Sequence, residues 1–465
     1  MLFFDHNTGT NAPRMLHQLQ DARKRGAEII TFNPIRERGL VSFANPQSQA
    51  NAAMVLYGMG ITQHRSGVHN IQMLSNLLLL CGNIGRPGAG ICPIRGHSNV
   101  QGQRTVGITE KPELAPLDKL KELYGFEPPR EKGMTTVEAC QGVLDGKVKA
   151  FIGLGGNFQE AIPGHHVMDP AWRQLRLTVQ IATKLNRSHL LHGEVAYLLP
   201  CLERIEIDAQ ASGEQWVSVE DSTACAHGSH GMAEPAGDVL LSEPAIVAGI
   251  AKALLPGNPK VDWDAWVGNY ARVRDAIERT YPDQFRDFNQ RFRQPGGFHR
   301  PLPACKREWK TENGKANFIV PDTLDEDADM PATGPDVLRL MTTRGDSQFN
   351  TTVYAPDDRF RGVYGTRDVL LMHQDDLMRL GFAEGDAVCI STVSNDGATR
   401  EVVGMRVHAF DIPRGCIMGY YPECNRLIPL SHHAKSSQVP ASKSIPVRLR
   451  RSAVVEEAAS PLPQN

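Results

Sequence analysis

Four short apolar runs in this sequence each lead into a loop of glycine and small polar residues. The runs span residues 2–4, 53–57, 150–154 and 175–181, and the loops span residues 7–11, 58–60, 155–157 and 183–186. Helical patterns lie between them; in one of these, residues 70–80, the apolar side chains share one face (Ile71, Leu74, Leu77, Leu78). Strands that alternate with helices are typical of doubly wound α/β folds with parallel sheets. Because ligands of such folds lie beyond the carboxyl ends of the strands, we expect these loops to bind one.

The amino-terminal residues 1–34 have the pattern strand, loop, helix, strand. Pro13 suits the first turn of the helix and Gly26 suits its end. The pattern therefore predicts half of a doubly wound unit.

The second half of the chain changes character twice. Residues 237–293 read as charged helices, with Trp263 and Trp266 packing in a core. Two stretches rich in Pro, Gly and Asp then predict a linker, at residues 294–303 and 321–335. After residue 336, five short runs read as strands separated by turn residues: 337–342, 369–372, 387–392, 401–407 and 415–420. They predict a small, mainly-β barrel.

Charge and composition exclude some partners. Lys and Arg number 50 against 52 Asp and Glu, so no basic field favours nucleic acid. No apolar run approaches the roughly 20 residues that span a bilayer, and the amino terminus lacks a secretion-signal pattern. We therefore expect a cytoplasmic protein without nucleic-acid or membrane partners.

The cysteines and histidines give no metal-ligand pattern. The nine cysteines include no Cys-x-x-Cys pair, which favours reduced structural thiols and no iron–sulfur cluster or metal ligand in this chain. Three histidine pairs, 165–166, 227 with 230, and 432–433, lack a Cys or carboxylate at a fitting offset. Surface or hydrogen-bonding roles are favoured for them over metal ligation.

Three linked motifs carry a family resemblance. A single Gly-x-Gly after a strand is weak evidence for a nucleotide, and residues 58–60 or 153–155 could each be only a tight turn. Residues 58–64 (Gly-Met-Gly-Ile-Thr-Gln-His), the glycine-rich residues 82–90, and residues 91–102 (Ile-Cys-Pro-Ile-Arg-Gly-His-Ser-Asn-Val-Gln-Gly) nevertheless follow one another in order. Together they resemble the prokaryotic molybdopterin-containing oxidoreductases, near the formate dehydrogenase alpha subunits. Residues 7–11, 33–38, 183–186 and the carboxyl-terminal region extend the similarity.

The resemblance implies an architecture and a cofactor. It implies doubly wound domains of the formate dehydrogenase and DMSO reductase kind, followed by a double-psi-type barrel. We expect partial α/β residues 1–97, a second α/β domain 98–210, a mixed helical connection 211–334 and the barrel 335–455. The implied cofactor is bis(molybdopterin guanine dinucleotide) with molybdenum or tungsten.

The resemblance also implies cofactor contacts. Those for one dinucleotide are Asn7, Gly9, Thr10, Asn11, Asn33 and Pro34, with Met59 and Gln63 at its pterin and Gly96 in the adjoining motif. Those for the other are Gly153, Gly155, Asn157, Thr183 and Asn186. The barrel would cap the pterins with Thr343, Arg344, Ser347, Gln348, Asn350, Asn425 and Lys443.

Arg95 and His97 are the predicted catalytic residues. A guanidinium can hold a carboxylate or other oxyanion through two parallel hydrogen bonds, although pairing of Arg95 with a pterin or an Asp fits equally well. His97 stands where formate dehydrogenases resembling this chain carry glutamine, and it could move a proton or hydrogen-bond the pterin. The substrate is expected to be formate or another small oxyanion, with the electron acceptor unspecified.

Two departures from the family pattern leave alternatives open. Many full members begin with a segment that binds a four-iron cluster, followed by the metal-ligating Cys, selenocysteine or Ser, and this chain starts after both. It also passes almost directly from residue 48 to the strand at residue 53. We therefore expect a truncated and internally shortened form. The alternatives are a non-catalytic cofactor-binding remnant and an unrelated α/β enzyme using NAD or thiamine diphosphate.

Overall fold

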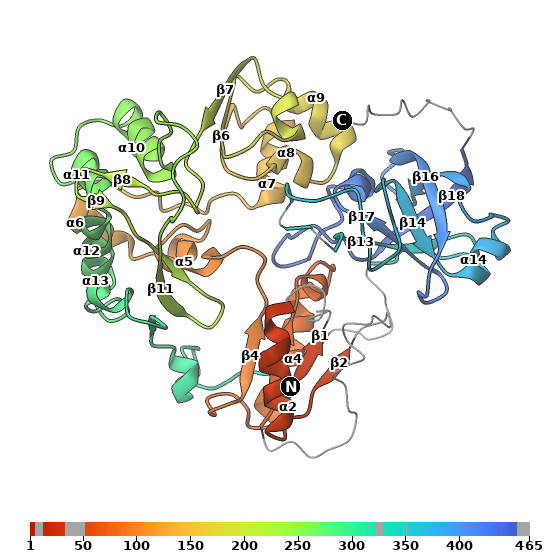
Figure 1. The fold of residues 1–465 in the computed structure, drawn as a ribbon, viewed down its shortest axis with the longest axis horizontal. Coiled ribbons are helices and arrows are strands. Elements are labelled where there is room, and N and C mark those ends of the chain that lie inside the picture. The colour runs from red at the N-terminus through yellow and green to blue at the C-terminus, as the bar shows by residue number, and fades with distance from the viewer. Residues whose placement is uncertain (5–12, 33–51, 322–328, 347, 350, 453–465) are drawn as a thin grey trace.

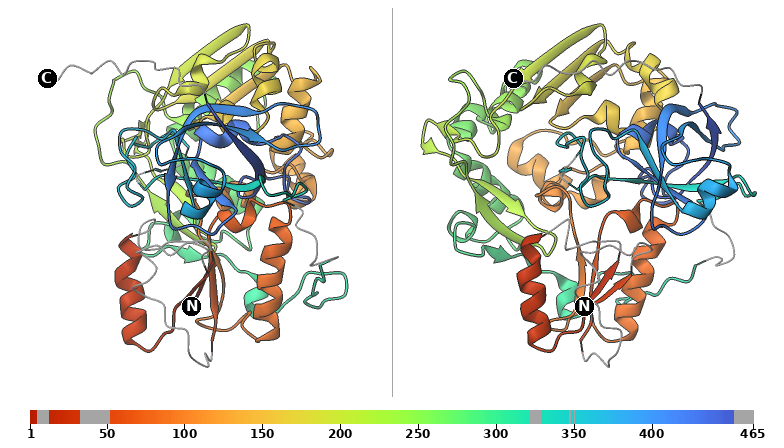
Figure 2. Two further views of the ribbon diagram at one scale, coloured as in Figure 1. Left: turned by 90° about the vertical axis from the view of Figure 1, so that its right-hand side faces the viewer. Right: turned by 45° about the vertical axis from the view of Figure 1, so that its right-hand side comes forward.

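The amino-terminal sheet is parallel and has a helix on each face. The computed structural model describes all residues except 5–12, 33–51, 322–328, 347, 350 and 453–465. The strands are β1 (Leu2–Phe4), β2 (Ile30–Phe32), β3 (Met54–Tyr57) and β4 (Gly90–Pro93), in the order β2-β1-β3-β4. Helix α2 (Leu16–Lys24), preceded by the short η1 (Pro13–Met15), and helix α4 (Gly67–Leu80) flank the strands (Figures 1 and 2). The predicted strand, helix, strand order of this region is confirmed.

Each helix buries one apolar stripe on this sheet. Leu19 of α2 packs with Phe3, while Leu74 and Leu78 of α4 pack with Val55 on the other face. Helix α4 begins three residues before the predicted start. The prediction was wrong for Leu77, which is 42% exposed because it lies at the margin of the stripe facing the sheet.

A second parallel sheet lies at the top of Figure 1. Its strands are β5 (Ala150–Leu154), β6 (Leu177–Ala182) and β7 (Val195–Pro200), and the helices α7 (Thr136–Leu144), α8 (Phe158–Ala161) and α9 (His165–Trp172) accompany them. Trp172 and Met168 of α9 form the core on one side with Cys140 of α7. On the other side, α10 (Glu243–Leu254) brings Ile246 against the buried residues of β6.

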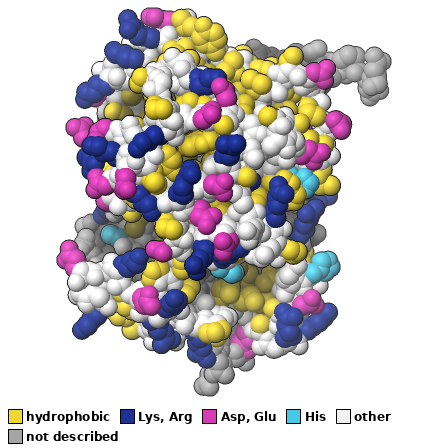
Figure 3. All heavy atoms as spheres, turned by 90° about the vertical axis from the view of Figure 1, so that its left-hand side faces the viewer, with side chains coloured by type: hydrophobic (Ala, Val, Ile, Leu, Met, Phe, Trp, Pro, Cys, Tyr) yellow, Lys and Arg dark blue, Asp and Glu magenta, His cyan; other side chains and the backbone are white. Residues whose placement is uncertain are grey.

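The side of the second sheet that α10 covers is only partly buried. The strand register places Ile152, Val179 and Tyr197 in one row across this side. Val179 is buried, whereas Ile152 is 48% and Tyr197 is 57% exposed. Figure 3 shows hydrophobic side chains gathered over the upper part of the corresponding surface.

A region of short helices and strands surrounds the second sheet in the sequence and leads to the carboxyl-terminal barrel. Its helices are α5 (Val100–Thr105), η3 (Pro112–Leu114), α6 (Leu117–Tyr124), α11 (Trp263–Gly268), α12 (Tyr270–Thr280), α13 (Phe288–Arg291) and η5 (Pro303–Lys306). Its strands are β8 (Ala209–Gln210), β9 (Gly213–Glu214), β10 (Val217–Glu220), β11 (Cys225–Ser229) and β12 (Phe298–His299). The short η4 (Arg187–Leu190) belongs instead to the second sheet, between β6 and β7. The expected tryptophan core is a half-buried edge contact between Trp263 and Trp266, with Tyr124 against Trp266. The first predicted linker is wrong in part, because β12 pairs with β11 there.

The carboxyl-terminal region is a closed six-stranded barrel. It contains β13 (Leu338–Thr343), β14 (Val369–Met372), α14 (Gln374–Arg379), β15 (Ala387–Thr392), β16 (Glu401–Ala409), β17 (Cys416–Tyr420), η6 (Glu423–Leu427) and β18 (Ile445–Arg451). The strand order is β13-β17-β14-β16-β15-β18, with parallel and antiparallel pairs. Its core includes Leu338, Val388 and Ile417, all fully buried. The five predicted strands are confirmed, and β18 is added.

The predicted fold class is confirmed by this arrangement. Parallel sheets flanked by helices occupy the first part of the chain, and a closed barrel follows. The domain boundaries at residues 97, 210 and 334 stay predictions. In the part of the chain that the structure describes, no helix combines the length and apolarity needed to span a membrane.

Candidate cofactor and active site

Arg95 and His97 lie on an exposed loop at the carboxyl end of β4. The amide of Ile94 donates to the carbonyl of Tyr57 at 2.8 Å, so the loop leaves the sheet beside the end of β3. The side chains of Arg95 and His97 have no hydrogen bond or ion pair with any described residue. Burial raises the pKa of the Tyr57 phenol, and the nearby Arg95 charge opposes that effect. An exposed guanidinium, without a partner in the part of the chain that the structure describes, therefore stands beyond the first sheet.

The far end of this loop is fixed to the connecting region. Asn99 has left-handed backbone (φ 65°), which asparagine tolerates better than most residues. Its Oδ1 accepts from the amide of Glu220 at 3.0 Å, and Ser98 Oγ accepts from Arg204 at 3.2 Å. The backbone around Arg95 is thus held at both ends while its side chain stays exposed.

The loop after β3 brings two predicted pterin contacts toward this site and toward the barrel. This loop includes η2 (Gly60–Thr62). Met59 is 51% exposed, and its sulfur lies 3.4 Å from where a Cβ on Gly96 would stand. Gln63 is joined to the barrel, since its Oε1 accepts from Ser442 and its carbonyl accepts from the amide of Lys443, both at 3.2 Å.

Lys443 and Thr343 lie at the same edge of the barrel. The ammonium of Lys443 donates to the carbonyl of Thr342 at 2.5 Å, one residue before Thr343. The backbone contact with Gln63 places Lys443 beside that residue, and a shared role of the two in holding a cofactor stays a prediction. Ser442, which the sequence analysis did not single out, makes the side-chain contact; its position next to Lys443 was the available signal.

The predicted contacts on the second sheet divide into two groups. Gly155 and Asn186 lie at the carboxyl ends of β5 and β6, beside the exposed Thr183. Asn186 donates to the carbonyl of Gly156 at 3.0 Å and accepts from the amide of Ser188 at 2.9 Å, which ties the two loops together. Gly153 is instead buried within β5, where a Cβ would come within 2.7 Å of Phe151.

Three predicted contacts use their amide groups within the protein. Asn157 exchanges hydrogen bonds with Thr351, one of them at 2.9 Å to its carbonyl. Gln348 donates to the carbonyl of Tyr421 at 3.1 Å and accepts from the amide of Gly345 at 3.0 Å.

Asn425, the third of these, is 2% exposed and donates to the carbonyls of Glu160 and Ile162, at 2.8 and 2.9 Å. Asn157 and Asn425 thus join the barrel region to the second sheet, whereas the bonds of Gln348 lie within the barrel region. Contact of these three amides with a cofactor stays a prediction. Eight predicted contacts lie outside the described residues: Asn7, Gly9, Thr10, Asn11, Asn33, Pro34, Ser347 and Asn350.

Arg344 adds a half-buried cation near the predicted capping segment. Burial lowers the pKa of its guanidinium, the neighbouring Arg361 lowers it further, and Asp346 acts in the opposite direction. The carbonyl of Arg344 accepts from Arg361 at 3.1 Å. Arg361 in turn forms an ion pair with Asp358 at 2.6 Å, so the charges at this segment are largely balanced within the barrel region.

Several histidines have the hydrogen-bonding roles predicted for them. His165 Nδ1 lies 3.0 Å from Asp169, His432 Nε2 donates to the carbonyl of Ser444 at 2.9 Å, and His230 Nδ1 donates to the carbonyl of Gly231 at 2.8 Å. Over the described ranges, no three metal-binding side chains of the His, Cys, Asp or Glu type come together. The described side chains thus give no metal site of their own, and the metal expected for this protein is the one carried by the cofactor.

Known proteins resemble this chain in sequence and in fold. Residues 7–177 match the molybdopterin oxidoreductase family. Protein YdeP of Escherichia coli O6:H1 is 39% identical over 546 aligned positions, which cover 96% of this chain and 71% of the relative. An uncharacterised oxidoreductase of Mycobacterium tuberculosis strain H37Rv is 36% identical over 545 positions, covering 96% of this chain and 69% of the relative. A Bacillus subtilis protein provisionally named formate dehydrogenase YrhE is 35% identical over 140 residues, 28% of this chain and 14% of that protein.

The alignment with YdeP also bears on chain length. Since 96% of 465 residues is about 446, about 100 of the 546 aligned positions have no residue of this chain. This agrees with the expected internal shortening. Among solved structures, acetylene hydratase from Pelobacter acetylenicus has a similar fold, with a TM-score of 0.57 at 13% identity over 97% of this chain and 77% of that one. The chain belongs to the molybdopterin oxidoreductase family.

Proposed function

We propose that this oxidoreductase binds bis(molybdopterin guanine dinucleotide) with molybdenum or tungsten and acts on a small oxyanion, of which formate is the simplest candidate. The family implies a molybdopterin cofactor, and the bound metal would supply the two-electron chemistry. The observation that carries the substrate class is Arg95, an exposed guanidinium without a partner among the described residues, beside the predicted pterin contacts.

The residues present fit a large cofactor with two arms. Loops at the carboxyl ends of two separate parallel sheets provide glycine backbone and polar side chains. Gly155 and Gly156 are exposed with positive φ (70° and 75°), and a Cβ on Gly156 would meet nothing within 4 Å. Open glycine backbone allows a phosphate or purine edge to approach closely. Gln63 and Lys443 then join the first of these loops to the barrel, which supports a cap over the pterins.

Arg95 and His97 have separate roles in this proposal. The Arg95 guanidinium would hold the substrate oxyanion through two parallel hydrogen bonds and fix its orientation. His97, two residues further along the same loop, would accept or return a proton at a ring nitrogen. The fixed backbone at Ile94 and Asn99 limits the movement of both side chains.

A second candidate function is cofactor binding without turnover. The observation that favours it is the absence of about 100 aligned positions that YdeP has. Family membership removes the expectation of an enzyme using NAD or thiamine diphosphate.

The first experiment measures cofactor content in the full chain purified from a host that makes the cofactor. We expect about one molybdenum or tungsten and two pterin dinucleotides per chain by elemental analysis and pterin fluorescence. A folded chain containing neither would refute the proposal. A loaded chain without turnover of formate, nitrate or other small oxyanions with dye acceptors would favour the second candidate.

The second experiment tests Arg95. Arg95→Ala should keep the cofactor but lower kcat/KM about 10- to 100-fold, because a charge-assisted hydrogen bond contributes roughly 1.5–3 kcal/mol. Arg95→Lys should recover only part of this loss, since an ammonium cannot bind in a bidentate manner. The exposed Arg173, at the end of α9, supplies the control variant Arg173→Ala. Equal activity of Arg95→Ala and Arg173→Ala would exclude Arg95 from the reaction.

A further inference from the structure

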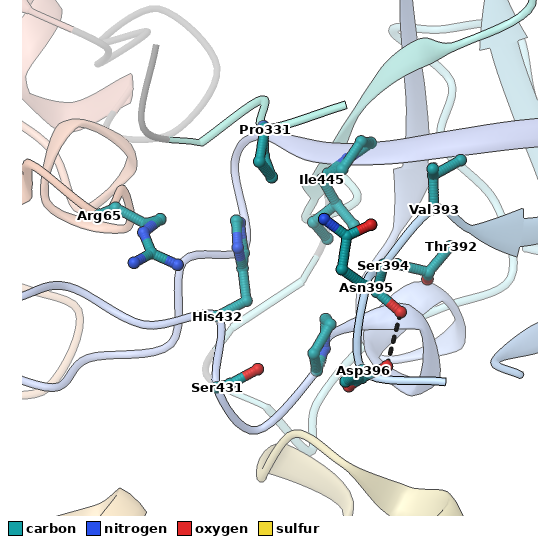
Figure 4. A pocket seen from close by; sticks show the side chains of 12 residues that line it. Arg65, Pro331, Thr392, Val393, Ser394, Asn395, Asp396, Ser431, His432 and Ile445 are labelled. Atoms are coloured by element: carbon teal, nitrogen blue, oxygen red, sulfur yellow. Dashed lines mark hydrogen bonds between the residues drawn. The ribbon is translucent and has the colours of Figure 1, made fainter. Parts of the chain in front are cut away.

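A polar cavity lies between the loop after η2 and the barrel. Its volume is about 280 Å³, and its polar lining includes Arg65, Ser394, Asn395, Asp396, Ser431 and His432 (Figure 4). These residues come from three parts of the chain: the loop before α4, the turn between β15 and β16, and the loop after η6. None of them was among the predicted site residues.

Arg65 enters this cavity from a fixed backbone. Its amide donates to Asp329 at 2.7 Å, and its carbonyl accepts from the amide of Lys435 at 2.9 Å. The side chain extends toward His432 and the turn at Asn395 (Figure 4). Its Nε is shielded from solvent and has no hydrogen-bond partner. Its guanidinium forms no ion pair within the described part of the chain, so the donors of Arg65 are available to an acceptor supplied from outside.

The opposite wall supplies further donors. The hydroxyl of Ser431 and the amide of Asn395 face the cavity and form no hydrogen bond with described residues (Figure 4). One carboxylate, Asp396, also lines the cavity, but it accepts from Arg400 at 2.6 Å and from Ser394 at 2.7 Å. Its charge is therefore compensated by Arg400. A second carboxylate, Asp329, lies next to Arg65 but outside the cavity lining, and it is paired with His64 at 2.9 Å.

His432 is the remaining polar group, and its tautomer follows from its partner. It is 6% exposed, and its Nε2 must carry a hydrogen because the carbonyl of Ser444 can only accept. Burial lowers the pKa of His432 below its ordinary value. The hydrogen bond to Ser444 and the Asp329 charge oppose this shift, and the Arg65 charge adds to it. The imidazole is thus neutral near pH 7, which leaves Arg65 as the cation facing this space.

We propose that this cavity binds a small molecule bearing an oxyanion group, such as a phosphate, sulfate or carboxylate, held by Arg65 with Ser431 and Asn395. The planar guanidinium matches two oxygens of such a group. The site is separate from the Arg95 loop and joins the loop carrying Gln63 to the barrel, so a bound anion would hold these parts together. The inference does not depend on the substrate proposed for Arg95.

The test titrates inorganic phosphate, sulfate and acetate into the full purified chain by calorimetry, at constant ionic strength with chloride as reference. We expect saturable binding of at least one of the three, and their ranking distinguishes phosphate from carboxylate ligands. Arg65→Gln should weaken binding at least tenfold, and Ser431→Ala should weaken it less. Arg173→Gln removes a guanidinium elsewhere and should leave binding unchanged.

Two further results would overturn the proposal. Binding of equal strength in Arg65→Gln and Arg173→Gln would place the anion elsewhere. Loss of bound pterin in Arg65→Gln, with an unchanged melting temperature, would assign Arg65 to the cofactor instead. If Arg65→Gln fails to fold, Arg65→Lys retains the charge but not the bidentate geometry, and it must still weaken binding relative to Arg173→Lys.

Discussion

Replacing Asn425 with alanine should loosen the barrel from the second sheet. The Asn425 amide is buried and donates to two carbonyls across this contact, those of Glu160 and Ile162. Its removal leaves both carbonyls without these donors. The Glu160 carbonyl still accepts from His165 Nε2 at 3.3 Å, whereas the Ile162 carbonyl loses its side-chain donor. One stranded buried group costs roughly 1–3 kcal/mol, so the contact should lose about 1–3 kcal/mol. The amide of Gly164 also donates to the carbonyl of Ile428 at 3.0 Å, and this backbone bond would remain.

Hydrogen exchange is the suitable assay, because a multi-domain chain need not unfold in one step. A loss of about 2 kcal/mol, the middle of this range, corresponds to about 30-fold faster exchange, at tenfold per 1.4 kcal/mol. The increase should be confined to residues 158–164 and 423–430, on the two sides of the contact. Asn317→Ala is the control, since Asn317 is exposed and should change stability by less than about 0.5 kcal/mol. Unchanged protection in Asn425→Ala would refute the view that this amide holds the two parts together.

Three other outcomes are expected. Burial raises the pKa of Asp329, but hydrogen bonds from His64 and from the backbone of Arg65 outweigh that effect and hold the pKa below its ordinary value of 3.8. The ionised carboxylate therefore stabilises the loop that carries His64 and Arg65 above about pH 4. This stabilisation is lost as the pH falls. Asp329→Asn should remove the acid-dependent part of that stability in a melting series from pH 7 to 3, and an unchanged series would contradict the assignment. Exposed Cys81 and Cys305 should react rapidly with a thiol reagent at pH 8, whereas Cys140, whose pKa burial raises to about 12, should react only after unfolding; peptide mass spectrometry distinguishes them. Tyr197→Lys should reduce aggregation measured by light scattering, because it interrupts the exposed apolar row, and equal scattering would show that this row is not self-associating.

Much of the fold could be predicted because its signals are local. Strands β14 and β15 match the predicted bounds, since each is a short apolar run between turn residues. Strand β18 was missed because its arginines at residues 448, 450 and 451 hide an alternating pattern whose apolar members complete the barrel. Local spacing also could not show that β12 pairs with β11, because that pairing joins residues about 70 positions apart.

The candidate site also has features that the sequence could predict and features that it could not. The motif around Arg95 could be recognised from residue order, and the structure places it at a strand end, with no partner for the Arg95 side chain among the described residues. Sequence alone could not separate exposed from buried members of the predicted contacts. Asn186 and Asn425 were both predicted to contact the cofactor. In the structure, Asn186 joins two loops at strand ends, whereas Asn425 is buried where the barrel region meets the second sheet. Arg65 was missed because its importance depends on a cavity formed with residues more than 300 positions away.

The hydrogen bond between Gln63 and Ser442 joins residues 379 positions apart. Closing so long a loop delays such a contact relative to the local helices and strands. During synthesis, at roughly 5–20 residues per second, the amino-terminal sheet would wait tens of seconds before the barrel could reach it. The apolar and polar groups at the strand ends stay accessible throughout that interval. Until the barrel forms, the loop after β3 lacks the two hydrogen bonds that Ser442 and Lys443 later donate to Gln63.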